Sequence, residues 1–469
     1  MIFSTYQFIF IFLPIVFAGY YILNGLKFKN LSKIWLVLAS LYFYSQGSPT
    51  FFPYFLGSVV ANYIIGTMLS KMPEKNLEKK ILFVLGILGN VVLLGYYKYT
   101  NFFIANFNLI TGNQYPYLNI ALPIGISFFT FQLIAFLVDS YRGETKEYDI
   151  INYLLFITFF PQLIVGPIVH HADVVPQFEN EENQKINFEN LAKGLFLFVI
   201  GCAKKICIAD VLTTDAQSFF NSLAKLEEAL TMFPTWFHSI EYTISYYFDL
   251  SGYADMAIGL GLMFNIVIPK NFNSPYKARN FQDYWRRWHI TLSNFLGAYI
   301  FRSVYKKGSK WRNYYIATMI TFFVSGFWHG AGYTFIAWGL INGVLVCIAA
   351  WMNKHDKKFP ASIAYFLTSI GVVLARVLFV SNGFSEALMV YKGMFNFNSF
   401  NGILEFLFAR IYEVIILILG IIICWFAPNS NEMAENFKPT YQNMIFIAIL
   451  FVLAISQMNK VVQFLYFQF

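Results

Sequence analysis

Long apolar stretches separated by short polar loops recur along the whole chain. Each is about as long as a helix needs in order to cross roughly 30 Å of hydrocarbon. The clearest cover Phe8–Leu23, Ile81–Tyr97, Gly332–Trp351, Ile363–Val380 and Ile411–Phe426. Less regular are Leu195–Ala209, which contains Lys204 and Lys205, and Ile445–Ile455, which is short. Since no segment alternates as barrel strands do, the pattern predicts an all-α polytopic membrane protein with about a dozen spans.

The composition agrees with this pattern. Of the 469 residues, 58% are hydrophobic and only 12% are charged, against about a quarter in soluble proteins. No polar stretch is long enough for a soluble domain, so we predict one integral-membrane domain over residues 1–469. The first apolar stretch lacks a basic leader and a cleavage site, which indicates a retained span. The four cysteines all lie in apolar segments, where packing is the simplest role.

The net charge of +8 is concentrated in loops, and basic loops of membrane proteins face the cytoplasm. The clusters lie at Lys27–Lys33, Lys71–Lys80, Lys277–Arg287, Arg302–Arg312 and Lys354–Lys358. This orientation places both chain ends outside. The stretch between Lys277 and Arg312 is basic at both ends, and its apolar middle is too short for a return crossing. A re-entrant or interfacial helix that begins next to His289 fits both facts.

The region from Tyr153 to Phe178 contains three prolines, which predict broken or tilted helices. It also contains the adjacent pair His170 and His171. Adjacent residues do not face one site on a helix, and no carboxylate or thiolate nearby completes a ligand set. We therefore predict no metal site. His238 and His355 are interpreted as loop or interface residues, and Asp249 and Asp255 as residues that orient helices.

Two short runs contain histidines at positions expected near the membrane: Tyr284–His289 and Gly326–Gly330. A polar site at membrane depth is by default a functional hypothesis. An imidazole can exchange a proton near neutral pH. The basic loops predict a chain reversal at His329, where glycines permit close backbone approach. We expect both histidines on one embedded path that opens to the cytoplasm.

Plainer interpretations of these residues stay open. His329 is also explained as a core histidine that bonds to a neighbouring helix, and His289 as an interfacial anchor beside Trp288. Ser325 lies four residues before His329 and shares its helix face, so a serine acyl-enzyme is conceivable. Small residues in membrane helices usually serve packing.

An ordered series of short sequence motifs is a more specific indication of function. They lie at Leu122–Gln132, Val138–Gly143, Phe160–Ile168, Lys204–Lys205, Ala209–Asp210, Tyr247–Leu260, Asn271–Tyr276 and in the two histidine runs. In this order they resemble the membrane-bound O-acyltransferase family, in the bacterial branch that acetylates exported polysaccharides. Two departures occur: Gly297 and Ala298 stand where the family usually has an arginine and an aspartate, and no arginine follows Phe379.

The resemblance implies a fold and a set of site residues. The fold is a ring of tilted helices around a thin centre pierced by a funnel. His329 matches the catalytic histidine and His289 the second functional position. Such an imidazole takes the proton of an attacking hydroxyl in acyl transfer from a thioester. Substrate contacts are expected from Trp328, Arg286, Arg287, Trp288, Asn271, Tyr276 and Ser325.

The carboxyl-terminal segment Phe464–Phe469 resembles the aromatic tail of these proteins. There, a terminal tyrosine is thought to carry the acyl group to an extracytoplasmic transferase. Tyr466 matches that residue, and the predicted orientation puts it outside. An aromatic anchor at the membrane interface is the plainer interpretation.

The expected function is therefore O-acetyl transfer in the bacterial inner membrane. Acetyl-CoA is the donor, and no permanently bound cofactor or nucleic acid is expected. The resemblance favours peptidoglycan as the acceptor, with alginate or another exopolysaccharide as the alternative, reached with a periplasmic SGNH-hydrolase-like partner. The basic loops from Lys277 to Arg287 and from Lys306 to Arg312 suit the phosphates of coenzyme A, although topology alone explains them. A lipid-linked sugar transporter is the alternative of another class, but it predicts internal repeats that are not visible.

Overall fold

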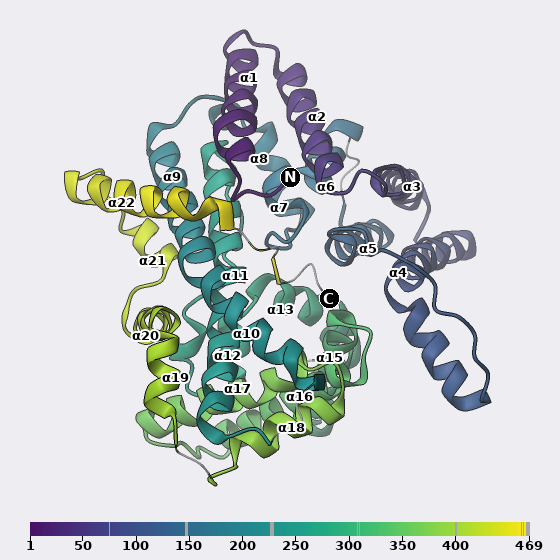
Figure 1. The fold of residues 1–469 in the computed structure, drawn as a ribbon. Helices are drawn as coiled ribbons and strands as arrows, with labels where there is room; N and C mark the ends of the chain where they lie inside the picture. Colours follow the sequence, from purple (N-terminus) through teal and green to yellow (C-terminus); the bar gives the residue numbers. More distant parts are fainter. Residues whose placement is uncertain are drawn as a thin grey trace. The chain divides into compact units, whose positions relative to one another are not determined.

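A computed structural model describes the chain except residues 75, 146–148, 226–228, 307, 309, 399–400, 461, 463 and 466–469. The described residues contain helices and no strand, which confirms the all-α prediction (Figure 1). They form two compact units: Met1–Phe198 with Ala254–Pro269, and Val199–Tyr253 with Lys270–Phe469. We call these unit 1 and unit 2. The single domain stays a prediction.

Unit 1 contains α1 (Leu13–Gly25), α2 (Lys29–Gly47), α3 (Phe52–Lys71), α4 (Leu77–Thr111), α5 (Ile126–Arg142), α6 (Ile150–Thr158), α7 (Phe160–Leu163) and α8 (His171–Glu179). Two helices continue from one unit into the other, α9 (Phe188–Ala203) and α11 (Met232–Met263). Unit 2 contains α10 (Asp210–Ser222), α12 (Phe281–Arg287), α13 (Ile290–Leu296), α14 (Arg302–Val304), α15 (Trp311–His329), α16 (Tyr333–Lys354), α17 (Ala361–Val380), α18 (Phe384–Met394), α19 (Ile403–Ala409), α20 (Ile411–Phe426), α21 (Ser430–Glu435) and α22 (Tyr441–Gln457).

Shorter π-helical and 3₁₀ segments interrupt or extend these helices. The π-helical segments are η1 (Phe8–Phe12), η3 (Lys204–Ala209) and η6 (Gly297–Phe301). The 3₁₀ segments are η2 (Glu181–Gln184), η4 (Leu223–Lys225), η5 (Pro275–Lys277) and η7 (Met458–Lys460). π-Helical turns are rare and are frequent at functional sites. Two of them lie in the regions of Lys205 and of the short helices after His289.

Several helices are long and apolar enough to cross a membrane, so the chain is a multi-pass membrane protein. Among the described residues, five satisfy both criteria, and a sixth candidate is the pair α19 and α20, which is bent by 88°. The five are Phe8–Gly25, α3, α4, α16 and α17. The predicted dozen is not reached by this measure. One physical reason is that α11 carries buried polar residues such as Glu241 and Asp249 along its length.

The proline-rich region of unit 1 is broken as predicted. Three short helices, α6, α7 and α8, replace one long span between Ile150 and Glu179. Pro161 lies in the first turn of α7, where its missing N–H costs no intrahelical hydrogen bond. The chain packs around buried phenylalanines: the ring of Phe160 lies 5.4 Å from that of Phe12 and 5.9 Å from that of Phe264. Such aromatic pairs anchor the core of this unit.

Within unit 2, α15 and α16 form a tight antiparallel hairpin (Figure 1). A Cβ atom added to Gly326 would lie 2.4 Å from the carbonyl oxygen of Phe335. A Cβ added to Gly339 would lie 2.3 Å from the carbonyl oxygen of Phe322. The two glycines therefore let the two backbones touch, as the sequence predicted for glycines near His329.

We expect Gly339→Ala to destabilise the protein by about 1–3 kcal/mol, because a backbone oxygen occupies the space that the methyl group needs. Gly57 in α3 is a matched control, since a Cβ there meets no atom within 4 Å. Alanine at that position should leave stability equal or raised by up to about 1 kcal/mol through helix propensity. Thermal melting in detergent measures both, and equal melting of the two variants would contradict the close contact.

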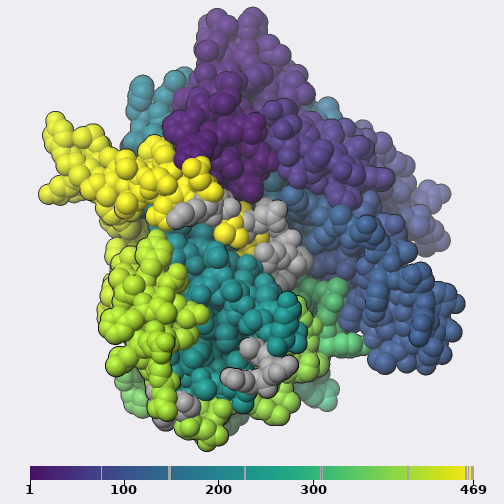
Figure 2. Space-filling view, viewed as in Figure 1, coloured from purple at the N-terminus to yellow at the C-terminus, as the bar shows by residue number. Residues whose placement is uncertain are grey.

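The carboxyl-terminal helix α22 presents an apolar surface. It projects from the rest of unit 2 and is yellow in Figure 2. Its exposed large side chains are Tyr441, Met444, Ile445, Phe446, Ile449, Val452 and Leu453. An exposed apolar face of this extent is typical of contact with lipid. The predicted segment Ile445–Ile455 is thus helical and longer than expected, although α22 remains shorter than a full span.

Candidate functional site

His289 lies at a sharp turn between α12 and α13. Its φ is 46°, in the left-handed region, and its side chain is 2% exposed. Non-glycine residues adopt this conformation uncommonly, and histidine is among those enriched there. Hydrogen bonds to Asn271 support the start of α13: the Ile290 N–H donates to its carbonyl at 2.8 Å and the Thr291 N–H to its side-chain oxygen at 3.2 Å. The backbone therefore fixes the position of the imidazole.

Some of the predicted substrate-binding residues are engaged within the protein. Asn271 also accepts a hydrogen bond of 2.9 Å from the Thr291 hydroxyl. The Tyr276 hydroxyl donates to the carbonyl of Thr243 at 3.0 Å. Arg287 pairs with Asp283 at 2.8 Å, and Arg286 is exposed. Asn271 and Tyr276 thus position the turn around His289 in this structure, and their contact with substrate stays a prediction.

His329 is the last residue of α15 and is 5% exposed. The chain reverses over Gly330–Gly332 before α16 begins, as predicted. The imidazole is surrounded by aromatic rings whose centres lie 4.9 Å away for Trp328, 5.1 Å for Trp338 and 5.4 Å for Phe379. Three different helices supply these rings, so packing fixes the orientation of the imidazole.

An aromatic network connects the surroundings of the two histidines. Trp288, next to His289, stacks on Tyr246 with ring centres 6.0 Å apart. Tyr246 contacts Phe379 at 5.3 Å, and Phe379 contacts His329. The two runs therefore meet in one cluster of unit 2, where α11, the turn between α12 and α13, α15 and α17 contribute side chains.

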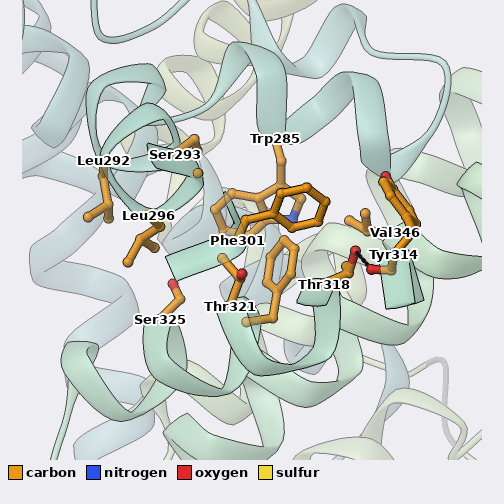
Figure 3. A pocket seen from close by; sticks show the side chains of 12 residues that line it. Trp285, Leu292, Ser293, Leu296, Phe301, Tyr314, Thr318, Thr321, Ser325 and Val346 are labelled. Atoms are coloured by element: carbon orange, nitrogen blue, oxygen red, sulfur yellow. Dashed lines mark hydrogen bonds between the residues drawn. The ribbon is translucent and has the colours of Figure 1, made fainter. Parts of the chain in front are cut away.

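A cavity of about 180 Å³ lies beside this cluster (Figure 3). Its lining is mostly apolar, with a few hydroxyl groups. It includes Trp285, Leu292, Ser293, Leu296, Gly297, Phe301, Tyr314, Thr318, Thr321, Phe322, Ser325 and Val346. The histidines are not lining residues, but Ser293 and Ser325 each lie one helical turn from one of them. Trp285 also contacts Trp338, at 5.8 Å between ring centres, and Trp338 contacts His329.

Ser325 points toward the cavity (Figure 3), and no hydrogen bond between it and His329 is present among the described contacts. Activation of a serine nucleophile requires such a bond in the reacting complex. The serine acyl-enzyme stays a hypothesis, and the lining position suits contact with a bound substrate.

Sequence reasoning missed Arg376, which lies in α17 near Phe379. Its guanidinium carbon is 4.2 Å from the centre of the Tyr246 ring and 5.2 Å from that of Trp288. A single arginine within an otherwise apolar predicted span was the available signal, because ionisable residues at membrane depth mark functional sites. The family arginine was expected just after Phe379, whereas the arginine of this chain, Arg376, lies about one helical turn before that position.

Two clusters of histidine and carboxylate correct earlier interpretations. The expectation that no carboxylate lies near His170 and His171 was wrong, because Asp139 lies 2.8 Å and 3.3 Å from their Nε2 atoms. Its hydrogen bond raises the pKa of His170. The prediction for His238 was also wrong: this residue is buried in α11, and its Nδ1 lies 3.0 Å from Glu241. Asp215 completes the second cluster, with its carboxylate 3.5 Å from His238. Both clusters have the spacing of metal ligands, and in each a carboxylate distant in sequence, Asp139 or Asp215, completes the group.

Tyr466 lies outside the described residues, but Phe464 and Leu465 just before it make contacts within unit 2. The Phe464 ring contacts Tyr253 at 4.9 Å, and the Lys205 ammonium lies 4.1 Å from its centre. The Leu465 N–H donates to Asp249 at 3.0 Å. Both residues are fully buried. The Lys205 ammonium also pairs with Asp249 at 2.6 Å and with Asp210 at 2.7 Å. Asp249 therefore has a structural role, as predicted.

Comparisons with known proteins agree with these features. The model of the membrane-bound O-acyltransferase family matches residues 97–391. A peptidoglycan O-acetyltransferase of Helicobacter pylori is 41% identical over 428 residues, which are 85% of this chain and 80% of that protein. A probable alginate O-acetylase of Pseudomonas aeruginosa is 36% identical, over 85% of this chain and 76% of that protein. A teichoic acid D-alanyltransferase of Bacillus subtilis is 28% identical over 58% of this chain and 70% of that protein.

The helical architecture, the buried histidine turn and these relatives agree. The chain belongs to the membrane-bound O-acyltransferase family and is a multi-pass membrane O-acyltransferase.

Proposed function

We propose that this protein moves an acetyl group from cytoplasmic acetyl-CoA across the bacterial inner membrane for O-acetylation of peptidoglycan, with a periplasmic partner that completes the transfer. The observation that carries this proposal is the 41% identity to a peptidoglycan O-acetyltransferase over 85% of the chain. Family membership as an acyltransferase argues against the transporter alternative.

His329 acts as the general base in this proposal. It is held at the tip of a rigid hairpin and is enclosed by Trp328, Trp338 and Phe379, which exclude water. A neutral imidazole can accept the proton of an attacking hydroxyl. His289 assists by positioning substrate, since its backbone is fixed on both sides.

The cavity is the proposed site for the thioester end of the donor. Its apolar walls suit an acyl chain and a thioester, and the hydroxyls of Ser293 and Ser325 supply a few polar contacts. Exposed basic residues adjoin the lining residues Phe301 and Tyr314 in sequence. They are Arg302, Lys306, Lys310 and Arg312. We propose that these side chains bind the phosphates of coenzyme A.

Purified protein incubated with acetyl-CoA tests the donor. We expect release of free coenzyme A thiol, with the acetyl group passed to water or to the Tyr466 hydroxyl, that depends on protein concentration and is faster with acetyl-CoA than with a long-chain acyl-CoA. The cavity of about 180 Å³ is small, which favours a short acyl group. Release no faster than the spontaneous rate would refute acetyl-CoA as donor.

The acceptor is tested in the bacterium that carries the gene. Deletion should remove base-labile acetate from purified peptidoglycan and leave acetate on secreted polysaccharide unchanged. Loss of acetate from the secreted polysaccharide, with peptidoglycan acetate unchanged, would support the alternative acceptor, alginate or another exopolysaccharide. The 36% identity to a probable alginate O-acetylase is the reason for testing it.

The carboxyl-terminal tail is the proposed acyl carrier, with the Tyr466 hydroxyl as acceptor. The support is the anchoring of Phe464 and Leu465 by Tyr253, Lys205 and Asp249 in unit 2.

After incubation with acetyl-CoA, mass analysis of the carboxyl-terminal peptide should show a gain of one acetyl group on Tyr466. Tyr466→Phe should remove this product and abolish glycan acetylation, because phenylalanine lacks the hydroxyl. Tyr441→Phe is a matched control, since Tyr441 is an exposed tyrosine at the start of α22. Full glycan acetylation in Tyr466→Phe would rule out the carrier role.

A further inference from the structure

Arg376 is a buried cation in α17, a helix long and apolar enough to cross the membrane. It is 4% exposed, and its Nε has no hydrogen-bond partner. In the described part of the chain, no carboxylate lies within 4.0 Å of its guanidinium nitrogens. Removal of a charge from water without a counter-ion is costly, and such residues at membrane depth face a cavity or a ligand.

Three aromatic rings hold the guanidinium in place. Its central carbon lies 4.2 Å from the ring centre of Tyr246, 5.0 Å from that of Phe379 and 5.2 Å from that of Trp288. These distances are typical of cation–π contacts, which attract a cation through the ring quadrupole. The rings carry no net charge, so they orient the guanidinium but do not neutralise it.

Phenol hydroxyls complete the surroundings. The hydroxyl groups of Tyr242, Tyr246 and Tyr284 are buried, and none has a hydrogen-bond partner of good geometry. The guanidinium lies over the Tyr246 ring, and its charge acts on the phenol groups of both Tyr246 and Tyr284. The rings of these tyrosines stack with Trp288 between them: Tyr242 on Tyr246 at 6.2 Å, and Tyr284 on Trp288 at 5.6 Å. We call Arg376 and these three tyrosines the arginine chamber; none of the four lines the cavity of about 180 Å³ described above.

The arginine chamber has hydrogen-bond donors and one positive charge. Guanidinium groups only donate, and a phenol hydroxyl can donate while its oxygen accepts from the guanidinium. Asp249, on the same helix as Tyr242 and Tyr246, is already paired with Lys205 at 2.6 Å. The chamber therefore lacks one negatively charged oxygen acceptor, and a bound anion or a developing oxyanion would supply it.

The chamber adjoins both histidines. The Phe379 ring contacts both the Arg376 guanidinium, at 5.0 Å, and the His329 imidazole, at 5.4 Å. Trp288, which contacts Arg376, immediately precedes His289. A reacting group near His329 is thus also near the one unneutralised buried cation described in this cluster.

We propose that the arginine chamber is the oxyanion subsite of the acyl-transfer centre, an inference that rests on the proposed function. In the step, the hydroxyl oxygen of the acceptor forms a bond to the thioester carbonyl carbon, and His329 takes the hydroxyl proton. The carbonyl oxygen becomes negatively charged and accepts hydrogen bonds from Arg376 and the phenol hydroxyls. The C–S bond then breaks, the carbonyl re-forms, and the leaving thiolate receives the proton from the imidazolium. Thioester and alcohol give ester and thiol.

Substitution of Arg376 tests the subsite through kcat. Loss of one oxyanion donor costs about 10²–10³ in kcat in other enzymes. We expect Arg376→Met to lower kcat for thiol release from acetyl-CoA by about that factor, with KM changed less than about threefold. Arg376→Lys should keep part of the rate because it keeps the charge. Added guanidinium chloride should partly restore Arg376→Ala, whereas sodium chloride of equal concentration should not.

Arg410 provides a matched control. Its guanidinium lies 4.5 Å from the Phe406 ring centre but also pairs with Asp215 at 3.3 Å, so its charge is already neutralised. Arg410→Met should retain kcat. Acetate, a carboxylate of the size of the acyl group, should inhibit the wild type, and Arg376→Met should be at least tenfold less sensitive.

The outcomes separate this inference from the proposed function. A wild type that releases no thiol overturns the proposed function and the subsite with it. An active wild type whose Arg376→Met variant keeps its kcat overturns the subsite alone. So does a loss of kcat that only parallels a loss of folded protein in size-exclusion chromatography, with neither guanidinium rescue nor altered acetate inhibition.

Discussion

His329→Ala should lower acetyl transfer by about 10²–10⁴-fold, the range that a positioned general base supplies. The imidazole is 5% exposed and packs against Trp328, Trp338 and Phe379, so an alanine there leaves no ring nitrogen in that position to accept the proton. Thiol release from acetyl-CoA by purified protein measures the rate. The loss should appear in kcat, because proton transfer occurs after the donor has bound.

The control for this prediction is His355→Ala. His355 is exposed beyond the end of α16 and lies 4.9 Å from Trp351 between ring centres. Its removal should leave the rate unchanged, and both variants should elute as folded protein. If His329→Ala retains the wild-type rate, another group must accept the proton, and the assignment of the base is wrong.

Lys205→Met should destabilise unit 2 by about 3–5 kcal/mol, the usual cost of removing one partner from a buried ion pair. Lys205 pairs with Asp249 at 2.6 Å and Asp210 at 2.7 Å, and its side chain is 1% exposed. Methionine would leave two buried carboxylates without their cation. The same substitution removes the contact with Phe464, so the carboxyl-terminal tail should become accessible to protease.

Lys193→Met is the comparison for this experiment. Lys193 lies in α9, and its pair with Glu189 is solvated, with the glutamate side chain 72% exposed. Exposed pairs contribute roughly 0–1 kcal/mol, so this variant should melt close to the wild type. Similar melting of the two lysine variants would show that the Lys205 pairs are not the stabilising contacts inferred from their geometry.

The sequence predicted the elements around His329 well because their signals are local. Apolar length, flanking basic loops and the glycines at 326, 330 and 332 all act within one hairpin. The short helices after His289 were expected for the same reason, since Ile290–Ile300 is too short to cross and return. Asn271 was predicted as a substrate contact. Its hydrogen bond to the first turn of α13 could not be predicted, because hydrophobic periodicity does not reveal the turn at His289.

What could not be predicted depends on residues far apart in sequence. Asp139 reaches His170 across 31 positions, and Lys205 reaches Asp249 across 44. The arginine chamber gathers residues from α11, α12 and α17, so its composition emerges only from packing. The number of spans stays a prediction: five or six described helices satisfy length and hydropathy, and buried polar residues lower the hydropathy of other long helices such as α11.

The chain reversal between α15 and α16 has a consequence for sequence change. Only Gly330, Ala331 and Gly332 join the two helices, and His329 ends the first of them. One inserted or deleted residue would have to be absorbed within this joint, since the contacts of Gly326 and Gly339 prevent the helices from sliding. Rotation by one position turns a helical side chain by about 100°, which would carry the imidazole away from Phe379. Length variation should therefore be tolerated in the long connection after α4 but selected against here.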